Sequence, residues 1–192
     1  MLSGELIFLL EAALFGATAV VATNLDNLLL SVSIAQVDGI RRTAVVFLSI
    51  QALVIALALG LSQLLEGFPG HWIGYLGILP ISLGVLELIR RIEHEAVPTT
   101  FGIFQSALLL ASNSGDSLAV LLVTFSDQAE KFDWVTVIGA GLAAVALTAA
   151  MIVLGTRPVA ERYLGPVARK LQPWLMIFIG LVILWDSPID VQ

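Results

Sequence analysis

The sequence contains no cysteine, and this absence removes several kinds of site at once. Disulfide bonds, thiolate metal sites and cysteine nucleophiles are excluded, so any bound metal must be held by oxygen or nitrogen. Cations are also scarce, because nine Lys and Arg stand against fifteen Asp and Glu, a formal net charge of −6. A chain with so few cations offers no basic surface, and we expect no nucleic-acid partner.

Charged residues make up only 12% of the 192 residues, whereas 58% are hydrophobic. A water-soluble fold cannot bury that much apolar surface. The sequence therefore predicts an all-α integral membrane protein, a single transmembrane domain over residues 1–192 that crosses the cell (inner or plasma) membrane several times. The first apolar segment carries Glu5 and Glu11 and is too long for a cleaved signal peptide, so we interpret it as a retained helix.

Six stretches are long and apolar enough to cross a bilayer, which takes about 20 residues each. Their expected limits are Leu6–Ala35, Thr43–Leu65, Trp72–Ile89, Thr99–Phe125, Trp134–Leu154 and Pro173–Trp185. Residues 157–171 mix basic and apolar side chains around two prolines. We expect this segment to lie along the inner membrane surface as a link between the last two spans.

The basic residues fall almost entirely in alternate loops. They are Arg41, Arg42, Arg90, Arg91, Arg157, Arg162, Arg169 and Lys170, and only Lys131 lies in a loop of the other set. Short loops rich in Lys and Arg remain in the cytoplasm. We therefore expect six transmembrane helices with both termini on the non-cytoplasmic side, where the loops are acidic.

Two short segments in corresponding positions resemble each other, and they divide the chain into halves. ATNLDNLLL, which begins at Ala22, resembles ASNSGDSLAV, which begins at Ala111. A weaker match links LGVLELI with IGLVILW through Gly84 and Gly180. With three spans per half, the halves insert upside down relative to each other. The prediction is two inverted three-helix repeats, about 1–97 and about 98–192.

Each of the two similar segments places an aspartate near the middle of a span. A lone carboxylate at the bilayer centre costs about 2.5 to 3.5 kcal/mol on insertion scales. No Lys or Arg lies near Asp26 or Asp116 in its own span. Each carboxylate must therefore be protonated, bind a cation or face a watery cavity.

The neighbours of the two aspartates carry oxygen atoms. Residues three or four apart share a helix face, and Gly115 gives the second segment a point where the helix can loosen. The predicted metal-binding residues are Asp26, Asp116, Asn24, Asn27, Asn113, Thr23, Ser112 and Ser117. Carboxylate, amide and hydroxyl oxygens suit a small, hard to intermediate divalent cation. The alternative is that these polar groups only join helices by hydrogen bonds.

Enzymatic chemistry finds no support in the sequence, which lacks a convincing nucleophile–base pair, a His-rich motif and a nucleotide-binding loop. The only histidines, His71 and His94, lie in different loops. We therefore predict no catalytic residue and no cofactor, and we rank a membrane-embedded enzyme or assembly factor below a transporter. Gln51 and Gln105 lie within spans, where we expect them chiefly to support helix packing.

The chain resembles the cadmium-resistance transporter family within the lysine-exporter superfamily of small six-span membrane transporters. The resemblance is carried by FGATAVVATNLDNLLLSVSIAQ, GYLGILPISLGVLELI, ASNSGDSLAV and PWLMIFIGLVILWD, which follow in order over nearly the whole chain. The family's first motif commonly ends in two consecutive acids, where this chain has Asp26 and Asn27. Its second motif reads Asn-Gly-Gly-Asp-Asn, where this chain has Asn-Ser-Gly-Asp-Ser over residues 113–117.

The resemblance implies a small exporter of divalent metals. Together with the aspartates it predicts a proton-coupled secondary transporter that exports Cd²⁺, Mn²⁺ or a similar ion by rocking one repeat against the other. Because the chain has no thiolate, Mn²⁺, Mg²⁺ and Ca²⁺ are chemically at least as reasonable as the soft Cd²⁺. An exporter of a small amino-acid-like solute is the alternative. The sequence leaves open whether two copies pair as a homodimer.

Overall fold

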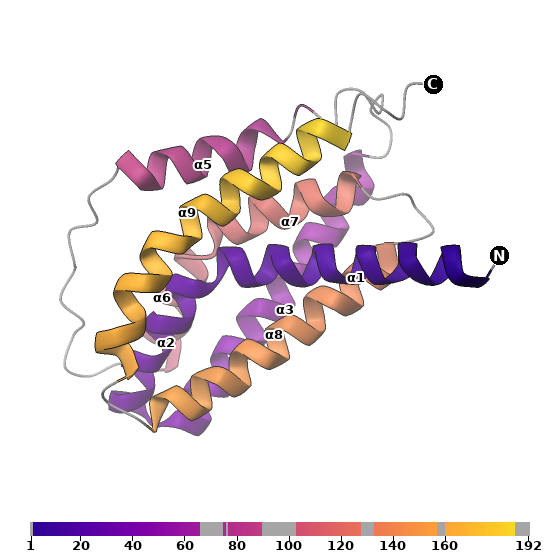
Figure 1. Ribbon diagram of the computed structural model, residues 1–192. Helices are drawn as coiled ribbons and strands as arrows, with labels where there is room; N and C mark the ends of the chain where they lie inside the picture. The colour runs from indigo at the N-terminus through magenta and orange to yellow at the C-terminus, as the bar shows by residue number, and fades with distance from the viewer. Residues whose placement is uncertain are drawn as a thin grey trace.

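The computed structural model in Figure 1 describes residues 2–65, 75, 77–89, 103–127, 133–156 and 160–186. Within these residues every regular element is an α-helix, which confirms the all-α class. The first half of the chain contributes α1 (Leu2–Thr23), α2 (Leu25–Asp38), α3 (Ile40–Leu65) and α5 (Ile78–Ile89). The second half contributes α6 (Ile103–Ser112), α7 (Gly115–Asp127), α8 (Asp133–Gly155) and α9 (Ala160–Asp186).

Three of these helices, α1, α3 and α8, are long and apolar enough to cross a membrane. The pair α6 and α7 makes a fourth span if its two pieces count as one, since they meet at a bend of 53°. Among the described residues the length criterion is therefore met three or four times, which fits a membrane-embedded protein. The predicted third span coincides with α5 only from Ile78 onward, because residues 72–74 lie outside the described part.

Both predicted spans that carry the aspartate motifs are broken at the motif. The first breaks at Asn24, whose backbone (φ −119°, ψ 13°) separates α1 from α2. The second breaks at Asn113 and Ser114, between α6 and α7. The second break lies directly before Gly115, where the helix was expected to loosen, but Gly115 itself is the first residue of α7. The first break falls within a stretch predicted as one helix. Asn is a poor helix former and supplies no large apolar side chain to hold a continuous turn.

The last helix is longer than predicted. Residues 157–171 were expected to link two spans along the membrane surface, but α9 begins at Ala160 and continues without interruption to Asp186. It passes through Pro166 and Pro173, which membrane helices tolerate where neighbours or adjusted turns satisfy the freed carbonyl groups.

The last helices of the two halves, α5 and α9, pack against each other through one glycine on each helix. They lie side by side in Figure 1. A Cβ atom built on Gly84 would lie 2.7 Å from the carbonyl oxygen of Pro173, and one on Gly180 would lie 2.6 Å from that of Gly77. The end of one helix therefore faces the beginning of the other, so the pair is antiparallel. This reciprocal contact is what two inverted halves produce.

A second glycine pair joins α1 to α8. A Cβ atom on Gly16 would collide with the carbonyl oxygen of Thr136, and one on Gly139 would collide with that of Ala13. Small residues at such a crossing let two membrane helices approach until their backbones touch.

More generally, α1 and α2 pack on α8, while α6 and α7 pack on α3. The first helix pair of each half thus contacts the helix that follows the corresponding pair in the other half.

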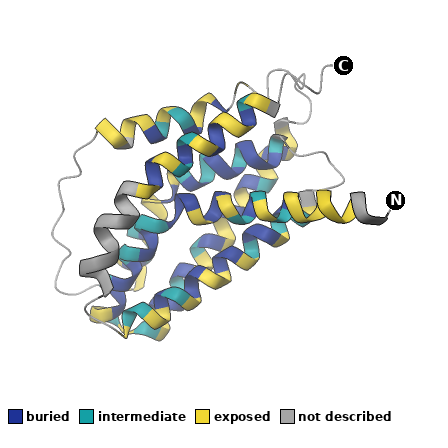
Figure 2. Ribbon diagram, in the orientation of Figure 1, coloured by how far each residue is buried: buried dark blue, intermediate teal, exposed yellow. Residues whose placement is uncertain are grey.

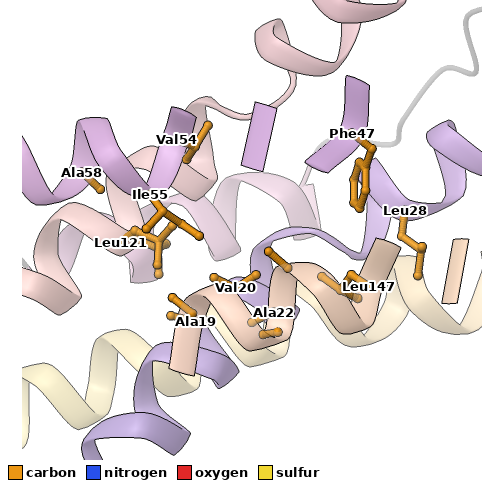
Figure 3. Packing of buried hydrophobic residues seen from close by; sticks show 14 of the residues in the cluster. Ala19, Val20, Ala22, Leu28, Phe47, Val54, Ile55, Ala58, Leu121 and Leu147 are labelled. Atoms are coloured by element: carbon orange, nitrogen blue, oxygen red, sulfur yellow. The ribbon is translucent and has the colours of Figure 1, made fainter. Parts of the chain in front are cut away.

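The core gathers where the broken helices meet α3 and α8. Figure 3 shows residues on both sides of the first break, such as Val20 and Leu28, among side chains of α3, α7 and α8, such as Phe47, Leu121 and Leu147. Burial falls off away from this region, and residues 5–11 of α1 are all exposed (Figure 2). The breaks therefore lie in the best-packed part of the bundle.

At one end of the bundle lie the junction of α2 with α3, the start of α6 and the end of α8. Ser106 Oγ donates a 2.9 Å hydrogen bond to Asp38 Oδ2, and a Cβ atom on Gly155 would contact Ile40 at 3.6 Å. Arg41 and Arg42 are exposed at this end. The other basic residues of the predicted cytoplasmic loops lie outside the described residues or in the part of α9 whose side chains are not described.

Candidate functional site

The two aspartates occupy the same position in the two halves. Asp26 is the second residue of α2 and Asp116 is the second residue of α7, so each lies in the first turn of the helix that follows a break. Asp26 is partly buried, and its Oδ1 atom is fully buried with no hydrogen-bond partner. Asp116 is also partly buried, and its Oδ1 accepts a 2.8 Å hydrogen bond from the Ser117 amide.

The two motifs meet through side-chain amides. The Asn113 side chain donates to Asp26 Oδ2 at 2.7 Å and to Asn27 Oδ1 at 2.9 Å. The Asn27 amide in turn donates to Ser114 Oγ at 3.2 Å. These three bonds connect segments that lie almost half the chain apart. Sequence similarity alone suggested that the motifs face each other, and the structure brings these residues into direct contact.

A fourth bond between the motifs reaches the backbone at the first break. Ser117, which is fully buried, donates through Oγ to the carbonyl oxygen of Thr23 at 3.1 Å. The Thr23 hydroxyl does not face the other motif, because it donates within its own helix to the carbonyl oxygen of Ala19 at 2.9 Å. Asn27 and Ser117 are each the third residue of their helix. Each therefore donates into the break of the opposite half.

Asn24 forms the buried end of this network. Its side-chain amide donates to the carbonyl oxygen of Val20 at 2.9 Å, which satisfies one of the last carbonyl groups of α1. Its Oδ1 accepts hydrogen bonds from Asn27, at 3.2 Å, and from the side-chain amide of Gln51 in α3. Gln51 is only 1% exposed. From the sequence, a role for Gln51 beside the metal ligands ranked below helix packing, and the structure shows that Gln51 does contact the motif at Asn24.

Ser112 is the predicted site residue that lies farthest from this arrangement. It is exposed, and its hydroxyl donates to the carbonyl oxygen of Leu109 in its own helix at 2.8 Å. Ser114, which was quoted in the motif but not among the expected ligands, contributes the contact to Asn27 instead. The second break is one residue longer than the first, so helical spacing could not place these two serines.

Helix geometry stabilises part of the charge on each aspartate. The N-terminus of a helix carries a partial positive charge, which stabilises a nearby carboxylate by about 0.3 to 2 kcal/mol. Placing a carboxylate in the bilayer centre costs about 2.5 to 3.5 kcal/mol, so the helix end does not cover the whole cost. A proton, a cation or water must supply the remainder. The buried Asp26 Oδ1, which has no protein partner, is the atom where a proton or cation would act.

Amide and hydroxyl oxygens outnumber carboxylates in the network. Among the described residues, no group of three or more His, Asp or Glu side chains lies together. A cation at this site would therefore be held by Asp26 with neutral oxygens, which is a ligand set for hard to intermediate ions. The network is fully buried at Asn24 and reaches the molecular surface at Asn113, so one side of it is accessible.

No protein-family model, curated protein or solved structure matches this chain. Function is therefore inferred from the residues of the site and from their contacts.

Proposed function

We propose that this chain is a secondary transporter that exports a divalent metal cation, Cd²⁺, Mn²⁺ or a similar ion, from the cytoplasm. The ion would bind between the two broken helices, with Asp26 as its charged ligand and the oxygens of Asn24, Asn27 and Asn113 around it. Asp116 would provide the second negative charge from the opposite half. The resemblance to the cadmium-resistance transporter family points the same way.

The observation that carries this proposal is the meeting of two interrupted helices at their breaks, where Asn113 of one half bonds to Asp26 of the other. An interrupted helix exposes backbone carbonyl and amide groups at membrane depth, which is tolerated only where they are satisfied by protein or by a bound solute. Paired interruptions from two inverted halves are the usual form of an ion site in secondary transporters. Packing alone would explain the hydrogen bonds of Asn27 and Ser117, but it does not explain a buried carboxylate oxygen without a partner.

The proposal includes six membrane crossings with both termini outside the cytoplasm. In this arrangement α1 with α2, and α6 with α7, each cross once as a broken span, and α3, α5, α8 and α9 supply the other four crossings. The exposed Arg41 and Arg42 then lie on the cytoplasmic side, together with the remaining basic loops.

The glycine contacts favour a moving unit other than a whole repeat. Gly84 and Gly180 join α5 to α9, and Gly16 and Gly139 join α1 to α8, each at backbone contact distance. Both pairs take one helix from each half, so sliding one half against the other would break both contacts. We propose that alternating access moves such helix pairs as units around the breaks. A proton that replaces the ion on Asp26 would reset the carrier and couple export to proton entry.

The test is metal transport by the purified full-length chain in liposomes, with Mn²⁺ and Cd²⁺ supplied separately. Asp26→Asn should reduce uptake at least about tenfold, since it removes the carboxylate that Asn113 of the other half contacts. Asp116→Asn should reduce it less, because Asp116 bonds within its own helix end. Asp38→Asn is the matched control, as Asp38 lies at the end of α2 and bonds to Ser106.

Full activity in both Asp26→Asn and Asp116→Asn would contradict the proposal. Metal uptake that leaves the internal pH unchanged would contradict the proton coupling alone. If the chain binds an amino acid and neither Mn²⁺ nor Cd²⁺ affects that binding, the transported solute is a small amino-acid-like molecule. This is the alternative that the sequence leaves open.

A further inference from the structure

Four buried side-chain oxygen atoms in the described part of the chain have no hydrogen-bond partner: Asp26 Oδ1, Gln51 Oε1, Gln172 Oε1 and Ser31 Oγ. Three of them belong to carboxylate or amide groups and can only accept. Burying such an acceptor without a partner costs about 1 to 3 kcal/mol. The three acceptors come from α2, α3 and α9, so the free-energy cost of burying them does not arise from the local conformation of a single helix.

Gln51 places one of these acceptors at the site. Its side-chain nitrogen donates to Asn24 Oδ1, which fixes the amide group against the first break. The other end of the same amide is Oε1, which lies within about 2.3 Å of the nitrogen by covalent geometry. This oxygen is buried and unpartnered, and the whole residue is 1% exposed. Gln51 therefore holds an acceptor oxygen beside Asn24.

Gln172 places a second acceptor beside the carboxylate. Its side chain lies within hydrogen-bonding reach of the Asp26 carboxyl group, although Gln172 belongs to α9 and is 1% exposed. Its Oε1 is buried without a partner, as is Asp26 Oδ1. Residue 172 stands just before the predicted last span, and only the early start of α9 brings it into the bundle.

We propose that Gln51 and Gln172 are direct oxygen ligands of the transported ion and determine its selectivity. This inference rests on the proposed function and deepens it. The three unpartnered acceptors come from three helices that border one network, since Gln51 bonds to Asn24 and the Gln172 side chain lies near Asp26. One cation bound at this network would give each of these oxygens a partner. Two amide oxygens with one carboxylate form a hard, oxygen-only set, which favours Mn²⁺ over the softer Cd²⁺.

The experiment compares Mn²⁺ and Cd²⁺ binding to the purified full-length chain by titration calorimetry. Gln51→Met and Gln172→Met keep the length of the side chain and exchange the amide for a soft thioether. Each should lower Mn²⁺ affinity at least about tenfold while Cd²⁺ affinity changes less than about threefold. Gln63→Met is the control, since Gln63 lies on the same helix as Gln51 and is exposed.

Glutamate variants separate a ligand from a packing residue. Gln51→Glu and Gln172→Glu keep an oxygen but lose the amide donor, so a ligand role predicts Mn²⁺ binding at wild-type affinity or tighter. A role limited to donating to Asn24 or Asp26 predicts that the Glu and Met variants fail alike. The Glu variants also decide the question if a Met variant does not fold.

Equal losses for both ions in the Met variants, or loss of Mn²⁺ in the Glu variants, would overturn this inference. Unchanged binding in the Met variants would also overturn it, and would show that water satisfies the two oxygens. Absence of metal binding by the unmodified chain would overturn the proposed function as well. The two failures are therefore distinguishable.

Discussion

The side-chain amide of Asn113 donates a 2.7 Å hydrogen bond to Oδ2 of Asp26, a residue in the opposite half of the chain. The same amide also donates to Asn27 at 2.9 Å, so Asn113 holds the first half of the site from the turn between α6 and α7. A donor at this position stabilises the ionised form of Asp26 when no cation is bound. Replacing this donor should therefore change how proton and metal compete.

The variant Asn113→Asp should bind divalent metal more tightly and with a steeper dependence on pH. It would place a second carboxylate against Asp26, and two such groups must share a proton unless a cation replaces it. Protons and metal then compete, so affinity should rise with pH. We expect a gain of about tenfold at pH 8, which corresponds to about 1.4 kcal/mol, and little or no gain at pH 6. Titration calorimetry at both pH values measures the difference, and a uniform loss at both would contradict it.

The variant Ser117→Ala should destabilise the protein by about 0.6 kcal/mol, the mean for hydrogen bonds between membrane helices, and by no more than about 1.7 kcal/mol. Ser117 is fully buried and bonds across the halves to the carbonyl oxygen of Thr23. Ser126→Ala on the same helix is the control, since its hydroxyl bonds only to Leu122 of α7. Thermal unfolding in detergent compares the two, and equal transitions would argue against a structural role for the bond between the motifs.

Two glycines on α8 should respond differently to alanine. A Cβ atom on Gly139 would overlap the backbone of Ala13, whereas one on Gly141 meets nothing within 4 Å. Gly139→Ala should therefore lower stability by about 1 to 3 kcal/mol, and should also slow transport if α1 and α8 move together. Gly141→Ala should be neutral or stabilising, because alanine favours helix by up to about 1 kcal/mol. Equal effects of the two changes on unfolding would contradict the close approach of α1 and α8.

The absence of cysteine makes every introduced cysteine a unique reporter of membrane sidedness. Arg42→Cys and Leu64→Cys place a thiol near each end of α3, and both positions are exposed. In cells or sealed vesicles of known orientation, an impermeant thiol reagent should label position 64 from the non-cytoplasmic side and position 42 only from the cytoplasmic side. Labelling of both positions from one side would contradict a crossing by α3, and the reverse pattern would contradict the orientation.

The sequence predicted the helical class because composition alone decides it. It also placed Asp26 and Asp116 in corresponding positions, since in each motif the aspartate is followed by an amide or hydroxyl residue and then by a leucine. The weak match of Gly84 with Gly180 turned out to be informative, because each glycine packs against the other's helix. Patterns repeated in two halves were reliable because the same local packing problem is solved twice.

Other features depended on contacts that spacing does not encode. The break at Asn24 could not be told from a continuous helix, because Thr23, Asp26 and Asn27 would also fit on one polar face of an unbroken helix. Gln51 and Gln172 reach the motifs from helices whose register is set by packing around them. The early start of α9 was missed since two prolines and several charges suggested a surface segment, and this also hid Gln172 from the expected site.

The contact between α1 and α8 also constrains how the chain is made. Gly16 can reach its partner backbone at Thr136 only after most of the polypeptide has left the ribosome. At ordinary translation rates this leaves α1 without its final neighbour for on the order of ten seconds. During that interval the break at Asn24 has no partner motif, so a membrane insertase or lipid must shield its polar groups. The packing of α1 is therefore completed only after α8 has been made.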